Sequence, residues 1–133
     1  MRLSSFVRRV VVPFACAAAA IFFVSGCGGS GATGDLDKVK VTISVVDVTV
    51  TNTSGRGMME VRVEIQPVGH QTAYTTRIPK LENGESRSLN FMAFSDKSGI
   101  QFSPRTARPH AVLVTAKDID GKDIMAEVPW KQG

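Results

Sequence analysis

Apolar and polar residues alternate along most of the chain beyond residue 37, which is the pattern of half-buried β-strands. Residues 39–45 carry apolar side chains at odd positions, whereas residues 46–50 carry them at even positions. Because a shift of one residue moves every side chain to the opposite face of a sheet, this change of phase predicts one long strand with a bulge or bend near Val45-Val46. Such a strand could serve both sheets of a sandwich.

Three further segments continue the alternation. Residues 59–65 alternate most regularly, and the predicted inner face carries Met59, Val61, Val63 and Ile65. The threonine-rich segment 72–78 precedes Pro79, which predicts a strand at the edge of a sheet. Segment 86–94 has Phe94 out of phase, which indicates a bulge or the end of a strand. Residues 100–102 form at most a short strand.

The last part of the chain predicts a β-hairpin. Residues 112–116 and 124–130 alternate on either side of Asp120-Gly121, a dipeptide typical of tight hairpin turns. No helical period appears after the N-terminal segment. We therefore expect an all-β domain over residues 38–133, an immunoglobulin-like antiparallel β-sandwich of about seven strands, with a core that includes Val61, Val63, Val114 and Trp130.

The N-terminal segment has a different composition. Residues 1–9 contain three arginines and no acid, and residues 10–24 contain no charged residue. A basic start, a short apolar stretch and small residues at its end are the three parts of a secretory signal peptide, here residues 1–26. Fifteen apolar residues of helix span about 22 Å, less than the roughly 30 Å hydrocarbon core of a bilayer.

The signal peptide ends in Val24-Ser25-Gly26-Cys27, which resembles the lipobox of bacterial lipoproteins, although Val24 stands where that family often has leucine. The resemblance implies a diacylglyceryl group on Cys27, cleavage after Gly26, and an exported protein held by lipid on a membrane of the bacterial cell envelope. The alternatives are an ordinary cleaved signal peptide and an uncleaved anchor helix. Residues 27–37 are then the lipidated cysteine and a flexible linker, since residues 28–37 are small and polar.

Charge and cysteine content exclude several functions. Removal of residues 1–26 takes three of the 16 basic residues, so the mature chain has 13 basic and 12 acidic residues. This near-neutral balance argues against nucleic-acid binding. The only other cysteine, Cys16, lies in the signal peptide, which leaves no thiol for a disulfide or a metal. A loose similarity of residues 38–130 to small Ig-like modules of bacterial envelope proteins carries no functional residues.

Catalytic and metal chemistry find no support in the sequence. The aspartates of the segment Asp118–Asp123 are flanked by predicted strands, whereas a calcium-binding EF-hand needs flanking helices and a terminal glutamate. The two histidines, His70 and His110, are forty residues apart beside turn residues, which favours surface positions over a zinc site. No serine or aspartate stands in a recognisable triad context. We therefore predict a non-enzyme that uses no cofactor.

The best candidate for a binding surface is the proline-bounded loop Ser103–Pro109. Its Arg105 and Arg108, with His110 and with Arg77 or Arg87, could form a basic patch for an anion or an acidic partner. The alternative is that these arginines are dispersed over the surface. Tyr74, on the predicted edge strand, is a second candidate for an exposed contact.

Two functional classes follow from these observations. One is a non-catalytic interaction module, lipid-anchored, that binds another envelope protein or an anionic envelope component. The other is a small ligand-binding or enzyme-accessory domain in the periplasm. The sequence shows no cluster of convergent polar residues, which favours the first class.

Overall fold

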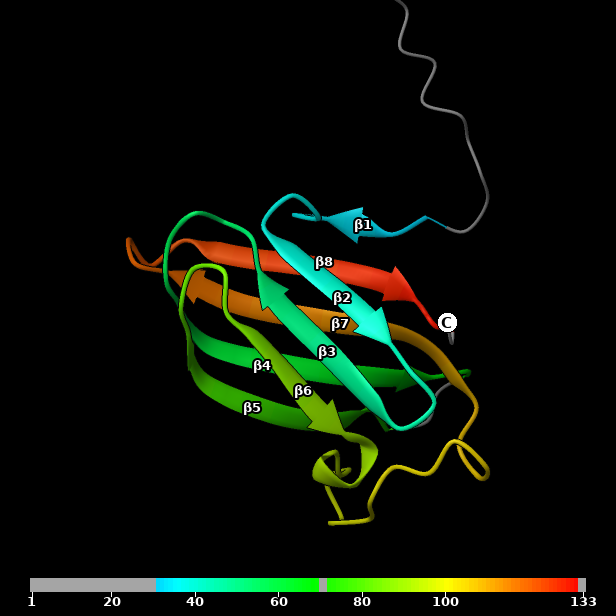
Figure 1. Cartoon of the computed structure of the whole chain (residues 1–133). Coiled ribbons are helices and arrows are strands. Elements are labelled where there is room, and N and C mark those ends of the chain that lie inside the picture. Colours follow the sequence, from blue (N-terminus) through cyan, green and yellow to red (C-terminus); the bar gives the residue numbers. More distant parts are fainter. Residues whose placement is uncertain (1–30, 70–71, 132–133) are drawn as a thin grey trace, which may run out of the picture.

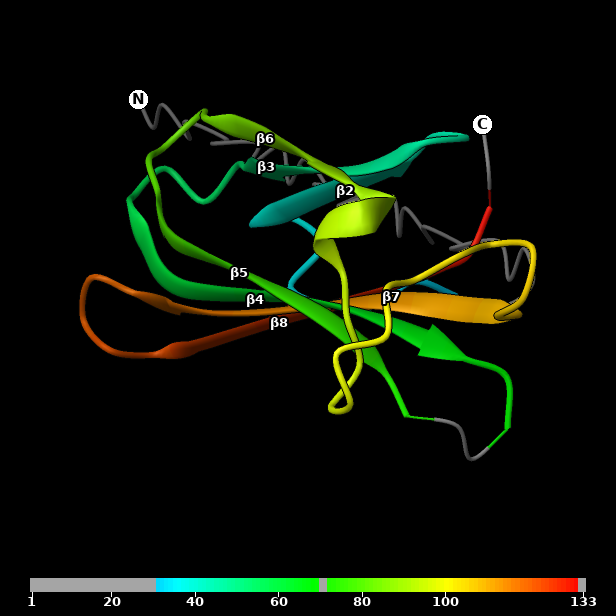
Figure 2. The ribbon, with the colours of Figure 1, turned by 90° about the horizontal axis from the view of Figure 1, so that it is seen from below.

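The computed structural model describes residues 31–69 and 72–131, which form two antiparallel sheets packed face to face (Figures 1 and 2). The five-stranded sheet has the order β1-β8-β7-β4-β5, and the three-stranded sheet has the order β2-β3-β6. The strands are β1 (Thr33–Gly34), β2 (Val39–Ile43), β3 (Asp47–Asn52), β4 (Met58–Pro67), β5 (Tyr74–Leu81), β6 (Ser86–Asn90), β7 (Pro109–Asp118) and β8 (Asp123–Pro129). The predicted all-β sandwich is thus confirmed.

The predicted signal peptide and Cys27 lie outside the described residues. Within residues 31–69 and 72–131, no helix has the length and apolar character needed to cross a bilayer. The one helical element there is a short 3-10 turn, η1 (Phe91–Ala93), which follows β6.

The core is the apolar layer between the two sheets. The middle of β4 and β7 contributes Val61, Val63 and Val114, which are fully buried as the alternation predicts. The three-stranded sheet covers them with the buried side chains of Val39, Ile43, Val48 and Val50. Trp130 lies at the margin of this layer, half-buried and in contact with it.

The predicted long first strand is wrong, because the chain reverses at the change of phase and forms the hairpin β2–β3. Ile43 pairs with Val48 within one sheet. The Ser44 hydroxyl oxygen accepts hydrogen bonds from the backbone N–H groups of Val46 (3.1 Å) and Asp47 (3.0 Å) and donates one to the Asp47 carboxylate (2.7 Å). A serine-centred turn of this kind lacks the glycine or proline that would mark it in a sequence.

The prediction that Met59 faces the core is also wrong. Glu60 has a positive φ of 52°, and the register between β4 and β7 shifts between Met59 and Arg62. This bulge turns Met58 fully into the core and leaves Met59 42% exposed. Val61 resumes the inward alternation, so only the first residues of β4 depart from the predicted phase.

The remaining strands follow the sequence closely. β5 lies at the edge of its sheet as predicted, but it continues past Pro79 to Leu81. Pro79 is tolerated because it stands opposite the bulge, between the paired positions Ile78 and Lys80. Phe94 is out of phase because η1 ends strand β6, and the β7–β8 hairpin turns at Asp120-Gly121 as predicted.

The predicted flexible linker is wrong in its second half, because Thr33–Gly34 pair with the edge of β8. The Asp35 N–H donates to the Met125 carbonyl oxygen (2.7 Å), and the Met125 N–H donates to the Asp35 carboxylate (3.1 Å). This second bond is the main cause that lowers the pKa of Asp35 below its usual range. Gly34 has a φ of 90°, and a Cβ there would overlap the Met125 carbonyl. The small residues thus serve close backbone approach.

We predict that Val63→Asp unfolds the domain. The substitution places an unpaired charge in the fully buried layer, with a cost of several kcal/mol against a typical total stability of about 5–15 kcal/mol. Met59→Asp, in the same strand but on the exposed side of the bulge, should change stability by about 0.5 kcal/mol or less. Chemical denaturation followed by circular dichroism measures both. Equal loss in the two variants would contradict the bulge.

A second prediction concerns the docking of β1. Gly34→Ala should release Thr33–Asp35 from β8 and so speed hydrogen exchange at the Met125 amide, whose partner is the Asp35 carboxylate. Gly99→Ala is the matched control, because Gly99 also has a positive φ (84°) but has no atom within 4 Å of its added Cβ. Unchanged Met125 protection in Gly34→Ala would show that β1 does not depend on glycine.

Candidate functional site

The predicted loop Ser103–Pro109 crosses from the small sheet to the large sheet at one end of the sandwich (Figures 1 and 2). The Ser103 carbonyl oxygen accepts hydrogen bonds from the N–H groups of Thr106 (3.2 Å) and Ala107 (2.9 Å). Ala107 is buried, and the Arg108 carbonyl oxygen accepts from Val68 N–H (2.8 Å) just beyond β4. The loop is therefore fixed by internal turns and by its neighbour as well as by its prolines.

The loop presents its basic side chains to solvent. Arg105, Arg108 and His110 are all exposed. Among the ion pairs of the described residues, none involves Arg105 or Arg108. An arginine held on a constrained backbone without a partner keeps its five donors available for an anion. These three predicted residues are thus all exposed within one short stretch of the chain at this end of the sandwich.

The other two arginines of the predicted patch lie elsewhere. Arg77 is in the middle of β5, where it pairs with Arg62 across the strands on the outer face of the large sheet. Arg87 is on β6 and donates to the Glu85 carboxylate (2.9 Å). The candidate surface therefore includes neither of them.

Tyr74 is half-buried, and its contact with a partner stays a prediction. Its ring packs edge-on against Phe102, with 5.3 Å between ring centroids. Phe102 also contacts Phe91 (5.3 Å) and Trp130 (5.6 Å), which makes an aromatic cluster directly before the loop. The chain after η1 folds along the start of β5, where Ser95 forms a bridge with Thr75, and this covers part of Tyr74.

Three exposed valines at the same end were not singled out as site residues by the sequence. Val45 (67% exposed) and Val46 (54%) form the tip of the β2–β3 turn, and Val68 (54%) follows β4. We call this part of the molecule the basic end; it comprises residues 44–47, 67–69, 103–110 and 130–131. The break in alternation at Val45-Val46 was a signal of this turn, but the sequence analysis interpreted it as a bend within one long strand.

Charges at the basic end have one predominant sign. It carries Arg105, Arg108 and Lys131, and its only carboxylate is Asp47. That carboxylate is already engaged, because the hydroxyl groups of Ser88 (2.6 Å) and Ser44 (2.7 Å) donate to it. These bonds, that from Ser88 first, lower the pKa of Asp47 below its usual range. These bonds keep Asp47 ionised, so the basic end has three basic side chains and one negative charge.

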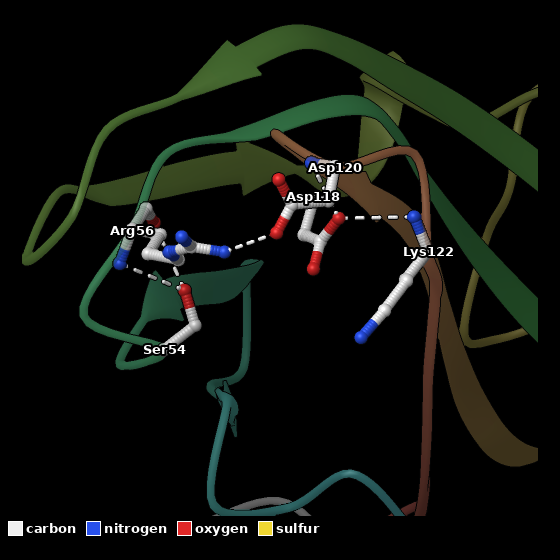
Figure 3. Close-up of polar contacts among 5 residues, drawn as sticks. All are labelled: Ser54, Arg56, Asp118, Asp120 and Lys122. Atoms are coloured by element: carbon white, nitrogen blue, oxygen red, sulfur yellow. Dashed lines mark hydrogen bonds and ion pairs between the residues drawn. The ribbon is translucent and has the colours of Figure 1, made fainter.

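The other end of the sandwich has the opposite balance. We call residues 53–58, 82–85 and 118–123 the acidic end, since they contain five carboxylates and two basic side chains. There the Asp118 carboxylate accepts the N–H groups of Asp120 (2.8 Å) and Lys122 (2.9 Å), and Asp120 pairs with Arg56 (Figure 3). The bond from the Lys122 backbone is the main cause that lowers the pKa of Asp118.

These contacts give the aspartates of the hairpin a structural role. Asp118 closes the turn, and Asp120 ties it to the loop after β3 through Arg56 (Figure 3). In the described part of the chain, no three histidine, cysteine or acidic side chains gather as metal ligands would. His70 lies outside the described residues.

One candidate pocket for the alternative function lies on the large sheet. A depression of about 630 Å³ lies on the outer face of the large sheet, where Arg62, Arg77 and Lys117 contribute to its lining. Arg62 pairs with Glu64 (3.4 Å), and Lys117 pairs with Glu60 (3.6 Å). Two of its three basic groups are therefore already paired with carboxylates on the same face.

We predict that the arginines of the basic end can be removed without loss of stability. The double variant Arg105→Ala/Arg108→Ala should change the free energy of unfolding by about 0.5 kcal/mol or less, because neither side chain has a partner. Phe102→Ala should cost about 3–5 kcal/mol, because it empties the aromatic cluster. Thermal or chemical denaturation compares the two. A large loss in the arginine variant would mean that the loop depends on its arginines for its structure.

Comparison of this chain with protein-family models and with curated proteins found no match. Its function is therefore argued from the sequence and from the geometry described above.

Proposed function

We propose that this protein is a lipoprotein of the bacterial cell envelope that acts as a non-catalytic interaction module. The observation that carries the proposal is the lipobox-like Val24-Ser25-Gly26-Cys27 at the end of a signal-peptide pattern, directly before a folded β-domain. Export, signal-peptide cleavage and lipid attachment to Cys27 follow from that resemblance.

The domain is proposed to be Ig-like in its topology. β2, β3 and β6 correspond in order to strands A, B and E of the immunoglobulin fold, and β8, β7 and β4 to strands G, F and C. β5 pairs with β4 and not with β6, and β1 adds a short strand to the edge of β8. In immunoglobulin variable domains the binding loops include B–C and F–G, whose counterparts here are the β3–β4 and β7–β8 connections at the acidic end. The choice of the basic end therefore rests on its own charges and not on this correspondence.

The surface that would carry the interaction is the basic end. Arg105 and Arg108 stand on a loop with a fixed backbone and form no ion pair with another described residue, so they can bind an anionic group with little loss of backbone entropy. The partner is another envelope protein or an anionic envelope component.

The alternative is a small ligand-binding or enzyme-accessory domain in the periplasm that uses the depression beside Arg62 and Arg77. Two arginines directly opposite each other on a sheet repel, which an anionic ligand would relieve. Ion pairs with Glu60 and Glu64 satisfy part of this charge without any ligand. Among the described residues, Arg105 and Arg108 form no ion pair, and the basic end therefore supports the proposal better.

The anchor is tested with Cys27→Ser. In cells that process lipoproteins, the wild-type protein should partition with membranes and show an intact mass that includes lipid on residue 27. Cys27→Ser should appear as an uncleaved precursor or as a protein without lipid, because serine lacks the sulfur that takes the diacylglyceryl group. Ser25→Ala is the matched control and should keep the lipid. An unmodified cysteine in a soluble wild-type protein would refute the proposal.

A further inference from the structure

We propose that the basic end faces the membrane that carries the anchor and docks on its anionic lipid headgroups. This inference rests on the proposed function, because it requires a lipid at Cys27. It adds the identity of the partner, a lipid surface, and the orientation of the domain on it.

The first argument is the place where the chain enters the fold. β1 runs antiparallel to β8, and Thr33 pairs with Glu127 close to the last residues of β8 (Figure 1). Thr33 is therefore the end of β1 that lies nearer the basic end, and the chain enters β1 from that side. Only five residues, 28–32, separate Cys27 from β1.

The connection from Cys27 to Thr33 is short. Six steps of extended chain reach at most about 20 Å. From the position of Thr33 beside Glu127, the acidic end begins at Asp123, four residues back along β8, or roughly 13 Å. The length of the connection keeps the domain close to the membrane, and the direction in which the chain enters β1 favours the basic end.

The second argument is the chemistry of the basic end. Val45 and Val46 are adjacent at the tip of a turn, and Val68 lies on another connection of the same end. The basic end thus has both features of a segment that binds at a membrane interface. Its apolar valines can contact the acyl boundary, and Arg105, Arg108 and Lys131 can contact anionic headgroups. Each basic side chain within about one Debye length of an anionic membrane surface adds to the free energy of membrane binding.

The third argument is the difference between the two ends. The basic end has three basic groups and one carboxylate, whereas the acidic end has five carboxylates and two basic groups. Two of those five carboxylates, Glu82 and Glu85, also pair with Lys80 and Arg87 just outside the acidic end. A negatively charged membrane attracts the basic end more than the acidic end, so charge and the direction of chain entry favour the same orientation.

The experiment places a spin label at each end of the full lipidated protein. Val45→Cys (67% exposed) and Val68→Cys report on the basic end, and Ile119→Cys (65% exposed) is the matched control on the acidic end. Each engineered cysteine is the only free thiol, since Cys16 leaves with the signal peptide and the Cys27 sulfur is in a thioether. The protein is reconstituted in vesicles of phosphatidylcholine with about one-third phosphatidylglycerol, and power saturation measures access of the label to oxygen and to a water-soluble nickel chelate.

We expect labels at residues 45 and 68 to gain oxygen access and to lose access to the chelate at least twofold relative to the label at residue 119. Vesicles without phosphatidylglycerol, or the stability-neutral Arg105→Ala/Arg108→Ala variant, should abolish at least half of that difference. Lys117→Ala/Lys122→Ala, which removes two charges close to the acidic end, should leave it unchanged.

The outcomes separate this inference from the function on which it rests. Protein that floats with the vesicles and has lipid on Cys27, but whose three labels are equally accessible to the chelate, overturns membrane docking and leaves the anchor intact. Protein without lipid on Cys27 overturns the proposed function itself. A protected label at residue 119 with exposed labels at residues 45 and 68 would reverse the proposed orientation.

Discussion

The apolar layer between the two sheets is the interaction on which the rest of the molecule depends. Neither cysteine lies beyond residue 27, so no disulfide can hold the domain together. The two ends are fixed by different means outside this layer. At the acidic end the buried Asn52 side chain donates to the carbonyl oxygens of Arg56 (2.6 Å) and Leu81 (2.9 Å) and accepts from Ser54 (2.7 Å), which joins the end of β3 to the β3–β4 connection and to the end of β5. At the basic end packing of Phe102 on its aromatic neighbours does this.

Alternation of apolar residues was enough to predict the fold class, the edge position of β5 and the β7–β8 hairpin, because burial against one layer forces a period of two. The predictions that were wrong fall where the period breaks. A break can be a turn, a bulge or the end of a strand, and each changes the phase by one residue. At Val45-Val46 the break is a turn closed by Ser44, and at Glu60 it is a bulge. Pairing between strands decides among these possibilities, and pairing is not visible in a local pattern.

The sequence predicted only part of the candidate surface, because contacts between distant segments are not visible in a local pattern. Pro104, Arg105 and Arg108 could be recognised because proline constrains the chain locally and arginine is seldom buried. Tyr74 could not be assigned, since its exposure depends on Phe102, which is distant in sequence. The docking of Thr33–Gly34 on β8 was missed because small residues are typical of linkers, and they also allow two backbones to approach closely.

The net charge of the mature chain, one positive charge, conceals a separation of charge along the sandwich. The sum of charges treats Arg105 and Asp118 as cancelling, but Arg105 lies before the start of β7 and Asp118 is its last residue. A surface that contacts one end of the sandwich is screened from the charges at the other end where these lie beyond a Debye length. For a domain anchored as proposed, what matters is therefore which end carries which sign and where the anchored segment joins the fold. β1 pairs beside the last residues of β8, so on that proposal a two-residue strand would determine how the charge of the whole domain is presented.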